Sequence, residues 1–155
     1  TLSLLMCLMT MFTWGCSSPG LETSEGDEKG YYSYHLTWPS LDIPVCWEDI
    51  SEVSEIDRQI VKIAAETSWA DHVPFNFSGW GQCQSTSHGI RIRNLLNLEN
   101  GHKRRPHTLG LGTRIRGVKN GMALKFNFSP SKSCGNSEEN RRACVYIIAV
   151  HEFGH

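Results

Sequence analysis

The segment that most constrains the fold lies at residues 145–155, where an uninterrupted apolar stretch leads into the sequence His-Glu-Phe-Gly-His. The apolar residues 145–150 are typical of a helix buried in a core. On a helix, residues four apart lie on one face, about 6 Å apart along the axis at a rise of ~1.5 Å per residue. The spacing therefore predicts that the imidazoles of His151 and His155 lie side by side, with the Glu152 carboxylate one residue round the helix.

This pentad is a metal-binding pattern. Two imidazoles so placed can bind one Zn²⁺ at roughly 2.0–2.1 Å each, and Glu152 can act on a metal-activated water without binding the metal itself. A buried helix that presents these groups also carries a desolvation cost unless a metal or other partners take them up. The pentad thus predicts a zinc hydrolase, with His151 and His155 as ligands and Glu152 as general base. The competing interpretation is a pair of ordinary surface histidines.

The amino-terminal residues predict export. Residues 2–12 form an uncharged apolar stretch as long as a signal-peptide core and shorter than the ~20 residues that a membrane-spanning helix requires. Gly15 and Cys16 resemble the lipobox of bacterial lipoproteins, although Thr13 stands where that motif usually has Leu. We expect residues 1–15 to be an incomplete signal peptide. Lipidation at Cys16 and ordinary secretory cleavage remain open. Both predict an exported protein, either secreted or held as a lipoprotein at the cell surface or outer membrane, and the likeness to a lipobox favours a bacterial one.

A short tether follows the predicted signal peptide. Residues 16–30 are mostly small, polar and acidic and contain no aromatic side chain, so they cannot bury enough apolar surface to offset the entropy lost on ordering. Residues 31–155 are then long enough for one domain with a core. The net charge of the chain is −1, and the basic stretch 100–121 has no aromatic residue for base stacking. We therefore expect no nucleic-acid partner.

Four cysteines fall within residues 31–155. An even number in an exported chain predicts two disulfides, with three connectivities to choose from. We expect one bond between Cys134 and Cys144, which would close a short polar loop onto the start of the last helix, and a second between Cys46 and Cys83. No C-x-x-C pair is present, which disfavours a cysteine zinc site.

The hydrophobic pattern predicts an α+β fold, a twisted mixed sheet packed on two helices. We expect a strand at 43–47, where Pro44 indicates a sheet edge or a strand start. A helix at 54–70, capped by Ser51 or Ser54, should pack one face on the sheet, the face that carries Ile56, Ile60, Ile63, Ala64 and Thr67 at helical spacing. Further strands are expected at 73–80, at 89–93 with one solvated face, and at 122–128. The second helix carries the pentad.

Together these segments resemble the catalytic domain of metzincin peptidases. The resemblance covers roughly residues 36–155 and is carried by 43–47, the helix after it, 89–92, 107–110, 122–128 and 149–155. The segment 150–155 is most similar to secreted matrixin-like peptidases, and astacin-like ones are also similar. The resemblance implies a zincin-like fold with only its N-terminal subdomain present, His151 and His155 as the first two zinc ligands, and Glu152 as the catalytic base. It also implies that the strand at 122–128 pairs with an extended protein or peptide substrate.

The expected function is zinc-dependent cleavage of peptide bonds in extracellular proteins. The third protein ligand is expected beyond residue 155, so residues 1–155 alone should bind zinc weakly and show no measurable proteolysis. Two alternatives stay open. A gluzincin-type peptidase would use a distant Glu as third ligand, and a non-catalytic exported adhesion or binding module on a metzincin-like scaffold would lack that ligand. No residue pattern identifies a Ca²⁺ site.

Overall fold

The computed structural model describes residues 34–95, 98–99, 102–103, 105–129 and 131–155, which belong to one unit of the chain. The expected signal peptide at 1–15, the tether at 16–30 and Cys16 lie outside the described residues. The elements in chain order are η1 (Tyr34–Leu36), β1 (Asp42–Trp47), η2 (Ile50–Glu52), α1 (Glu55–Ala65), η3 (Glu66–Ala70), β2 (Asn76–Gln82), β3 (Ile90–Asn94), β4 (Leu98–Glu99), β5 (His102–Lys103), β6 (His107–Thr108), η4 (Gly112–Ile115), β7 (Met122–Leu124) and α2 (Glu138–Phe153).

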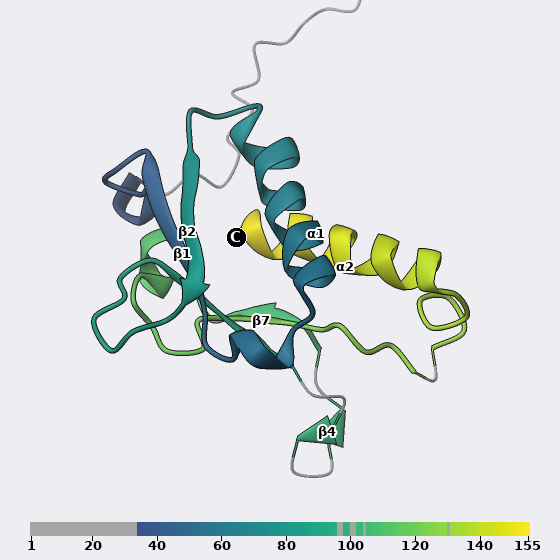
Figure 1. Ribbon diagram of the computed structural model, residues 1–155. Helices are drawn as coiled ribbons and strands as arrows, with labels where there is room; N and C mark the ends of the chain where they lie inside the picture. The colour runs from purple at the N-terminus through teal and green to yellow at the C-terminus, as the bar shows by residue number, and fades with distance from the viewer. Residues whose placement is uncertain (1–33, 96–97, 100–101, 104, 130) are drawn as a thin grey trace, which may run out of the picture. The chain divides into compact units, whose positions relative to one another are not determined.

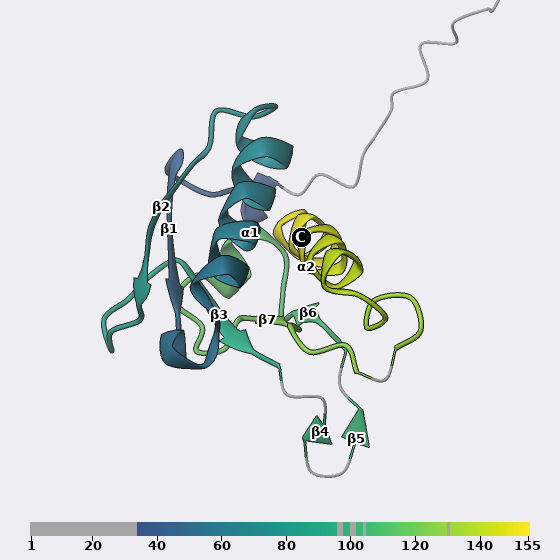
Figure 2. The ribbon, with the colours of Figure 1, turned by 45° about the vertical axis from the view of Figure 1, so that its right-hand side comes forward.

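The main sheet has five strands in the order β2-β1-β3-β7-β6. All neighbouring strands are parallel except β6 and β7, which are antiparallel. Strands β4 and β5 form a separate antiparallel pair. Both helices lie on the same side of the sheet (Figures 1 and 2). The prediction of an α+β fold with a mixed sheet packed on two helices is confirmed. Within the described residues, no helix has both the length and the apolar character to span a membrane.

β1 lies inside the sheet, between β2 and β3, so of the two positions that Pro44 indicated the sheet edge is wrong, and Pro44 is the third residue of the strand. The carbonyls of Leu41 and Trp47 accept hydrogen bonds from the β2 side, from Asn76 and Cys83. By alternation along the strand, the Pro44 nitrogen faces β3, whose pairing with β1 begins one residue later. The missing N–H of proline therefore costs no bond of the ladder, and an interior strand tolerates it.

The core lies between the sheet and the two helices. Alternate residues of β1 point inward, and each buried Ile or Val side chain contributes roughly 1.5–3 kcal/mol relative to an exposed one. Trp47 packs against Phe126 with ring centroids 6.1 Å apart. The most deeply buried members of this core include Ile43, Val45, Trp47, Val61, Ala64, Ala65, Ile92, Met122, Leu124, Val145 and Ala149.

The helix expected at 54–70 is present as α1 followed by one π-helical turn, η3. The Ser54 hydroxyl caps it by accepting a hydrogen bond from the Asp57 N–H at 3.1 Å. The predicted apolar face is only partly right, because Ile56 and Ile63 are 54% and 48% exposed. Asp57 is buried instead and forms an ion pair with Arg141 of α2 at 2.8 Å. The face of α1 that packs inward is therefore the one that carries Asp57.

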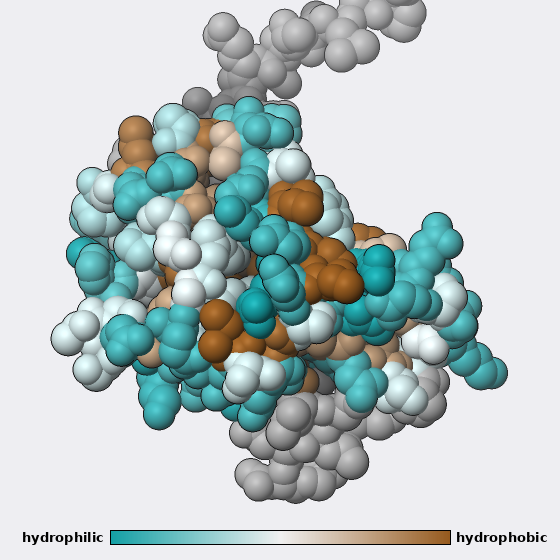
Figure 3. Space-filling model, in the orientation of Figure 1, coloured by the Kyte–Doolittle hydropathy of each residue, from teal (hydrophilic) through white to brown (hydrophobic). Residues whose placement is uncertain are grey.

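α2 also has an exposed apolar side, so the prediction that residues 145–150 are buried all round is wrong. Ile147 is 64% exposed. Figure 3 shows apolar surface over the region where α1 crosses α2. Residues 145–150 are apolar on all sides of the helix, but only one side of α2 packs on the core. The sheet and α1 cover that side and leave the opposite side exposed.

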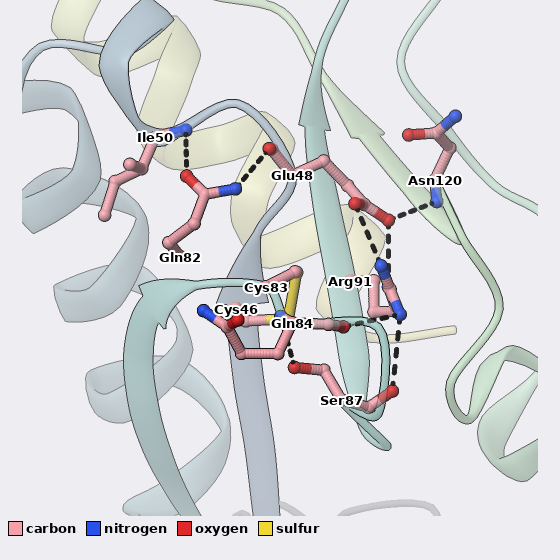
Figure 4. Close-up of a disulfide and its surroundings, with 9 residues drawn as sticks. All are labelled: Cys46, Glu48, Ile50, Gln82, Cys83, Gln84, Ser87, Arg91 and Asn120. Carbon is pink, nitrogen blue, oxygen red and sulfur yellow. Dashed lines mark hydrogen bonds and ion pairs between the residues drawn. A yellow bond between two sulfur atoms is a disulfide. The ribbon is translucent and has the colours of Figure 1, made fainter.

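Both predicted disulfides are present, Cys46–Cys83 and Cys134–Cys144. Beside the first, Arg91 of β3 is buried and its guanidinium donates to both carboxylate oxygens of Glu48, at 2.9 and 3.0 Å (Figure 4). These bonds lower the pKa of Glu48, and the backbone N–H of Asn120 adds to the effect. The solvated face predicted for this strand is therefore wrong at Arg91, where the loop 84–87 covers the guanidinium and accepts bonds from it.

Removing the Cys46–Cys83 bond should destabilise the fold more than removing Cys134–Cys144. The bonds span 37 and 10 residues, respectively. Because the entropy removed from the unfolded chain grows with the logarithm of loop length, the double Cys→Ala variant of the first pair should lose about 1 kcal/mol more than that of the second, within losses of ~2–4 kcal/mol. Urea unfolding of both variants measures this. Equal losses would contradict the loop-length argument.

Candidate active site

The pentad lies at the carboxyl end of α2, whose start is defined by local signals. The Ser137 hydroxyl accepts a hydrogen bond from the Asn140 N–H at 3.1 Å, which caps the first turn. Glu138 and Glu139 place negative charge at the positive end of the helix dipole. Arg141 and Arg142 each donate to Glu138, and these hydrogen bonds lower the pKa of its carboxyl to about 2. The carboxylate therefore stays ionised across the neutral range.

Arg141 fixes the start of α2 to its neighbours. Its guanidinium donates to the Asp57 carboxylate of α1 at 2.8 Å and to the Phe126 carbonyl at 3.2 Å. The Cys134–Cys144 disulfide ties the preceding loop to the same part of the helix. α2 is thereby held against both α1 and the segment after β7.

Glu152 lies on the buried face of α2. Val145, Ala149 and Glu152 are the buried residues of this helix, and their spacing of four and then three residues makes one stripe. The Glu152 side chain therefore points into the molecule, and it is 4% exposed. A buried carboxylate needs polar partners, because an unpaired charge in an apolar site is costly.

The partner of Glu152 is Thr108 of β6. The Thr108 hydroxyl lies 2.8 Å from Oε2 of Glu152, and it also lies 3.3 Å from the Glu152 main-chain carbonyl. The other carboxylate oxygen, Oε1, takes no hydrogen bond from a described residue. Among the described side chains the only fully buried polar atom found without a partner is Trp47 Nε1.

The two histidines of the pentad lie at the surface. Both are exposed, and their rings meet edge to face with centroids 4.9 Å apart. The prediction that both stand on the helix is only partly right, because α2 ends at Phe153. Gly154 and His155 close the end with N–H bonds to the carbonyls three residues before them, a tighter turn than the α-helix. This turn still brings the His155 ring beside that of His151.

Other elements hold the end of α2 from three sides. The Trp69 indole N–H of η3 donates to the Val150 carbonyl at 2.9 Å. The Gly112 N–H at the start of η4 donates to the His155 carbonyl at 2.9 Å. A Cβ at Gly154 would lie 2.7 Å from the Trp69 ring, so this position of the pentad favours glycine. The Phe153 ring packs against Phe77 of β2, with centroids 5.3 Å apart.

The strand beside the pentad is β6, and the prediction that residues 122–128 form the cleft-edge strand is wrong. β7 covers only residues 122–124 of that range, and it lies inside the sheet between β3 and β6. β6 is the edge strand of the sheet formed by the described residues. The Leu109 N–H donates to Gly121 beside β7, so by alternation the N–H and C=O of Thr108 face the unpaired edge.

The donor set fits zinc in its chemistry and in the spacing of its rings. Two imidazoles bound to one zinc at ~2.0–2.1 Å with a tetrahedral angle between them would have ring centroids about 5 Å apart. The 4.9 Å between the rings of His151 and His155 matches this value. No group of three His, Cys, Asp or Glu side chains that could hold a metal ion occurs in the described part of the chain. A zinc site here needs a third ligand from elsewhere.

The structure thus brings the three predicted site residues together and adds Thr108, which the sequence did not single out. No local pattern connects residues 44 positions apart in the chain. The inward position of Glu152 was not predicted either, because it follows from the buried stripe of α2 that the structure shows. Comparison with protein-family models and with the curated proteins finds no match to this chain.

Proposed function

We propose that this chain carries the zinc-binding helix and the substrate-binding edge of a metzincin-like zinc endopeptidase. The observation that carries the proposal is a buried carboxylate, Glu152, next in the chain to His151, whose exposed ring meets that of His155 edge to face. A zinc hydrolase needs this combination of exposed neutral ligands and an adjacent base. His151 and His155 would supply two ligands, and a residue outside those described would supply the third.

The edge of β6 provides a place for an extended peptide. The N–H and C=O of Thr108 face the edge of the sheet that the described residues form, so they can pair with the main chain of a substrate, which is β-strand addition and gives affinity with little sequence choice. The side chain of the same residue contacts Glu152. A substrate paired at this edge therefore lies next to the carboxylate and the histidines. The exposed side chains of Leu109 and Leu111 follow directly along the chain.

In the proposed reaction Glu152 is the general base. When bound, zinc supplies an electrophile that polarises the scissile carbonyl and makes water more acidic. The free oxygen of Glu152, Oε1, accepts the proton of the attacking water. The carboxylic acid so formed then gives that proton to the leaving amine, so the base is regenerated in each turnover. The edge strand holds the peptide in line for attack.

The test of this proposal is metal content together with peptide cleavage in the full-length protein. Wild type should hold one zinc per chain, lose cleavage on treatment with a chelator and regain it with added zinc. His151→Ala should weaken zinc binding by more than about 100-fold, because removal of even a hydrogen-bond partner of a zinc ligand lowers metal affinity about 10- to 100-fold.

His72→Ala, at an exposed histidine outside the pentad, is the matched control and should leave zinc content unchanged. A wild-type protein without zinc, or a His151→Ala protein with undiminished zinc affinity, would contradict the proposal. Zinc binding without cleavage would favour a binding module.

A further inference from the structure

We infer that Thr108 is a positioning residue, whose hydroxyl fixes the carboxylate of Glu152 in the orientation that the reaction needs. The inference rests on the proposed function and adds to it a residue outside the pentad. The observation that supports this inference directly is the hydrogen bond of 2.8 Å from the Thr108 hydroxyl to Oε2 of Glu152.

The bond selects one of the two carboxylate oxygens. The terminal torsion of a Glu side chain is broad and roughly two-fold, so a carboxylate without a partner samples many orientations. With Oε2 bound to Thr108, rotation of the carboxylate is restricted and Oε1 is the oxygen that stays free. Oε1 takes no hydrogen bond from a described residue, so it is the oxygen that would accept the proton of the attacking water in the proposed reaction.

The position of Thr108 also connects substrate binding to the base. Its main-chain groups face the open edge of β6 and its side chain faces Glu152. A peptide that pairs with this strand therefore contacts the same residue that holds the carboxylate. A misplacement of about 1 Å at a reacting group can cost about 100-fold in rate, so the hydroxyl should affect turnover more than substrate binding.

Two variants of the full-length, zinc-loaded protein separate the hydroxyl from the shape of the side chain. Thr108→Val keeps the branched shape and removes the donor, whereas Thr108→Ser keeps the donor. We expect Thr108→Val to lower kcat about 10- to 100-fold, the range seen for groups that orient catalytic ligands, with KM and zinc content unchanged. Thr108→Ser should recover most of kcat. Thr86→Val, at an exposed threonine of the loop 84–87, is the matched control.

A second measurement does not depend on activity. In zinc-free protein, Thr108→Val should raise the unfolding equilibrium constant about tenfold or more over that of Thr108→Ser, because the bond to the carboxylate is charge-assisted. In a Glu152→Ala background the same ratio should fall toward one. The ratio therefore reports whether the hydroxyl and the carboxylate interact in solution.

The outcomes distinguish this inference from the proposed function. If wild type cleaves and Thr108→Val matches it in kcat, or if Thr108→Ser is as impaired as Thr108→Val, the positioning role is wrong and the proposed function stands. If the unfolding constants of Thr108→Val and Thr108→Ser differ by the same factor with and without Glu152, the hydrogen bond between Thr108 and Glu152 does not form in solution. If zinc-loaded wild type cleaves no peptide, the proposed function fails and the catalytic role of Thr108 fails with it.

Discussion

Glu152→Gln is expected to lower kcat by about 10²–10⁴-fold while leaving zinc content and fold intact, because general-base catalysis contributes about that much. The amide of glutamine still offers an oxygen to the Thr108 hydroxyl, so the hydrogen bond of 2.8 Å can be kept. What the variant removes is the ability to accept a proton. The glutamine side chain has nearly the volume of glutamate, so the packing of the buried stripe on α2 is preserved.

The measurement is the initial rate of hydrolysis of a quenched peptide by full-length protein, with zinc content determined on the same samples. Glu139→Gln is the matched control, since Glu139 is an exposed glutamate on the first turn of the same helix. It should match wild type. A Glu152→Gln protein that hydrolyses peptide at the wild-type rate would show that this carboxylate is not the base.

Gly89→Ala should destabilise the fold by about 3 kcal/mol or more, toward the upper end of what overpacking costs. A Cβ at Gly89 would lie 2.0 Å from the carbonyl oxygen of Pro44 and 3.0 Å from its Cβ. Pro44 belongs to β1 and Gly89 directly precedes β3, and these two strands are neighbours inside the sheet. The clash is with backbone, so it is relieved only if the two strands separate where their pairing begins.

Gly81→Ala on β2 provides the control. No atom lies within 4 Å of a Cβ built at Gly81, so this substitution should change the free energy of unfolding by less than about 1 kcal/mol. Urea unfolding of the two variants and wild type gives the comparison. A Gly89→Ala protein as stable as Gly81→Ala would mean that β1 and β3 are farther apart than described.

The elements that the sequence predicted well are those with strong local signals. α2 has a capping serine at Ser137 and an apolar stripe, and α1 has a capping serine at Ser54. Both disulfides were predicted from the even number of cysteines in residues 31–155 and from the short loop between Cys134 and Cys144. These signals depend on residues close together in the chain, or on covalent chemistry that allows few arrangements.

The features that were missed depend on partners distant in the chain. Periodicity alone favoured Ile56 as a buried residue of α1, but the pairing of Asp57 with Arg141 turns another face inward. Arg91 reads as a solvated strand residue until Glu48 is placed beside it. A charge is tolerated inside only when its partner is present, and that partner cannot be read from local spacing.

The edge strand was the hardest element to predict. β6 has two residues, too few for an alternating pattern, whereas the longer alternating segment 122–128 predicted a strand, which the metzincin resemblance placed at the edge of the cleft. All three residues of β7 are buried, which is typical of a strand inside a sheet. The pairing that makes β6 the edge, and that brings Thr108 to Glu152, is a property of the assembled sheet.

The way in which α2 is held has a practical consequence for engineering. Arg141 secures the start of this helix, and Trp69 and Gly112 secure its end, so none of these contacts involves the exposed residues Lys132 and Ser133. A peptide inserted between Lys132 and Ser133 would separate Ser131 from Cys134 and Gly135, whose N–H groups donate to it beside the Cys134–Cys144 disulfide. A substitution of the exposed side chain of Lys132 leaves these contacts in place, so a label attached there would sit on the surface while the relative placement of His151, Glu152 and Thr108 is preserved.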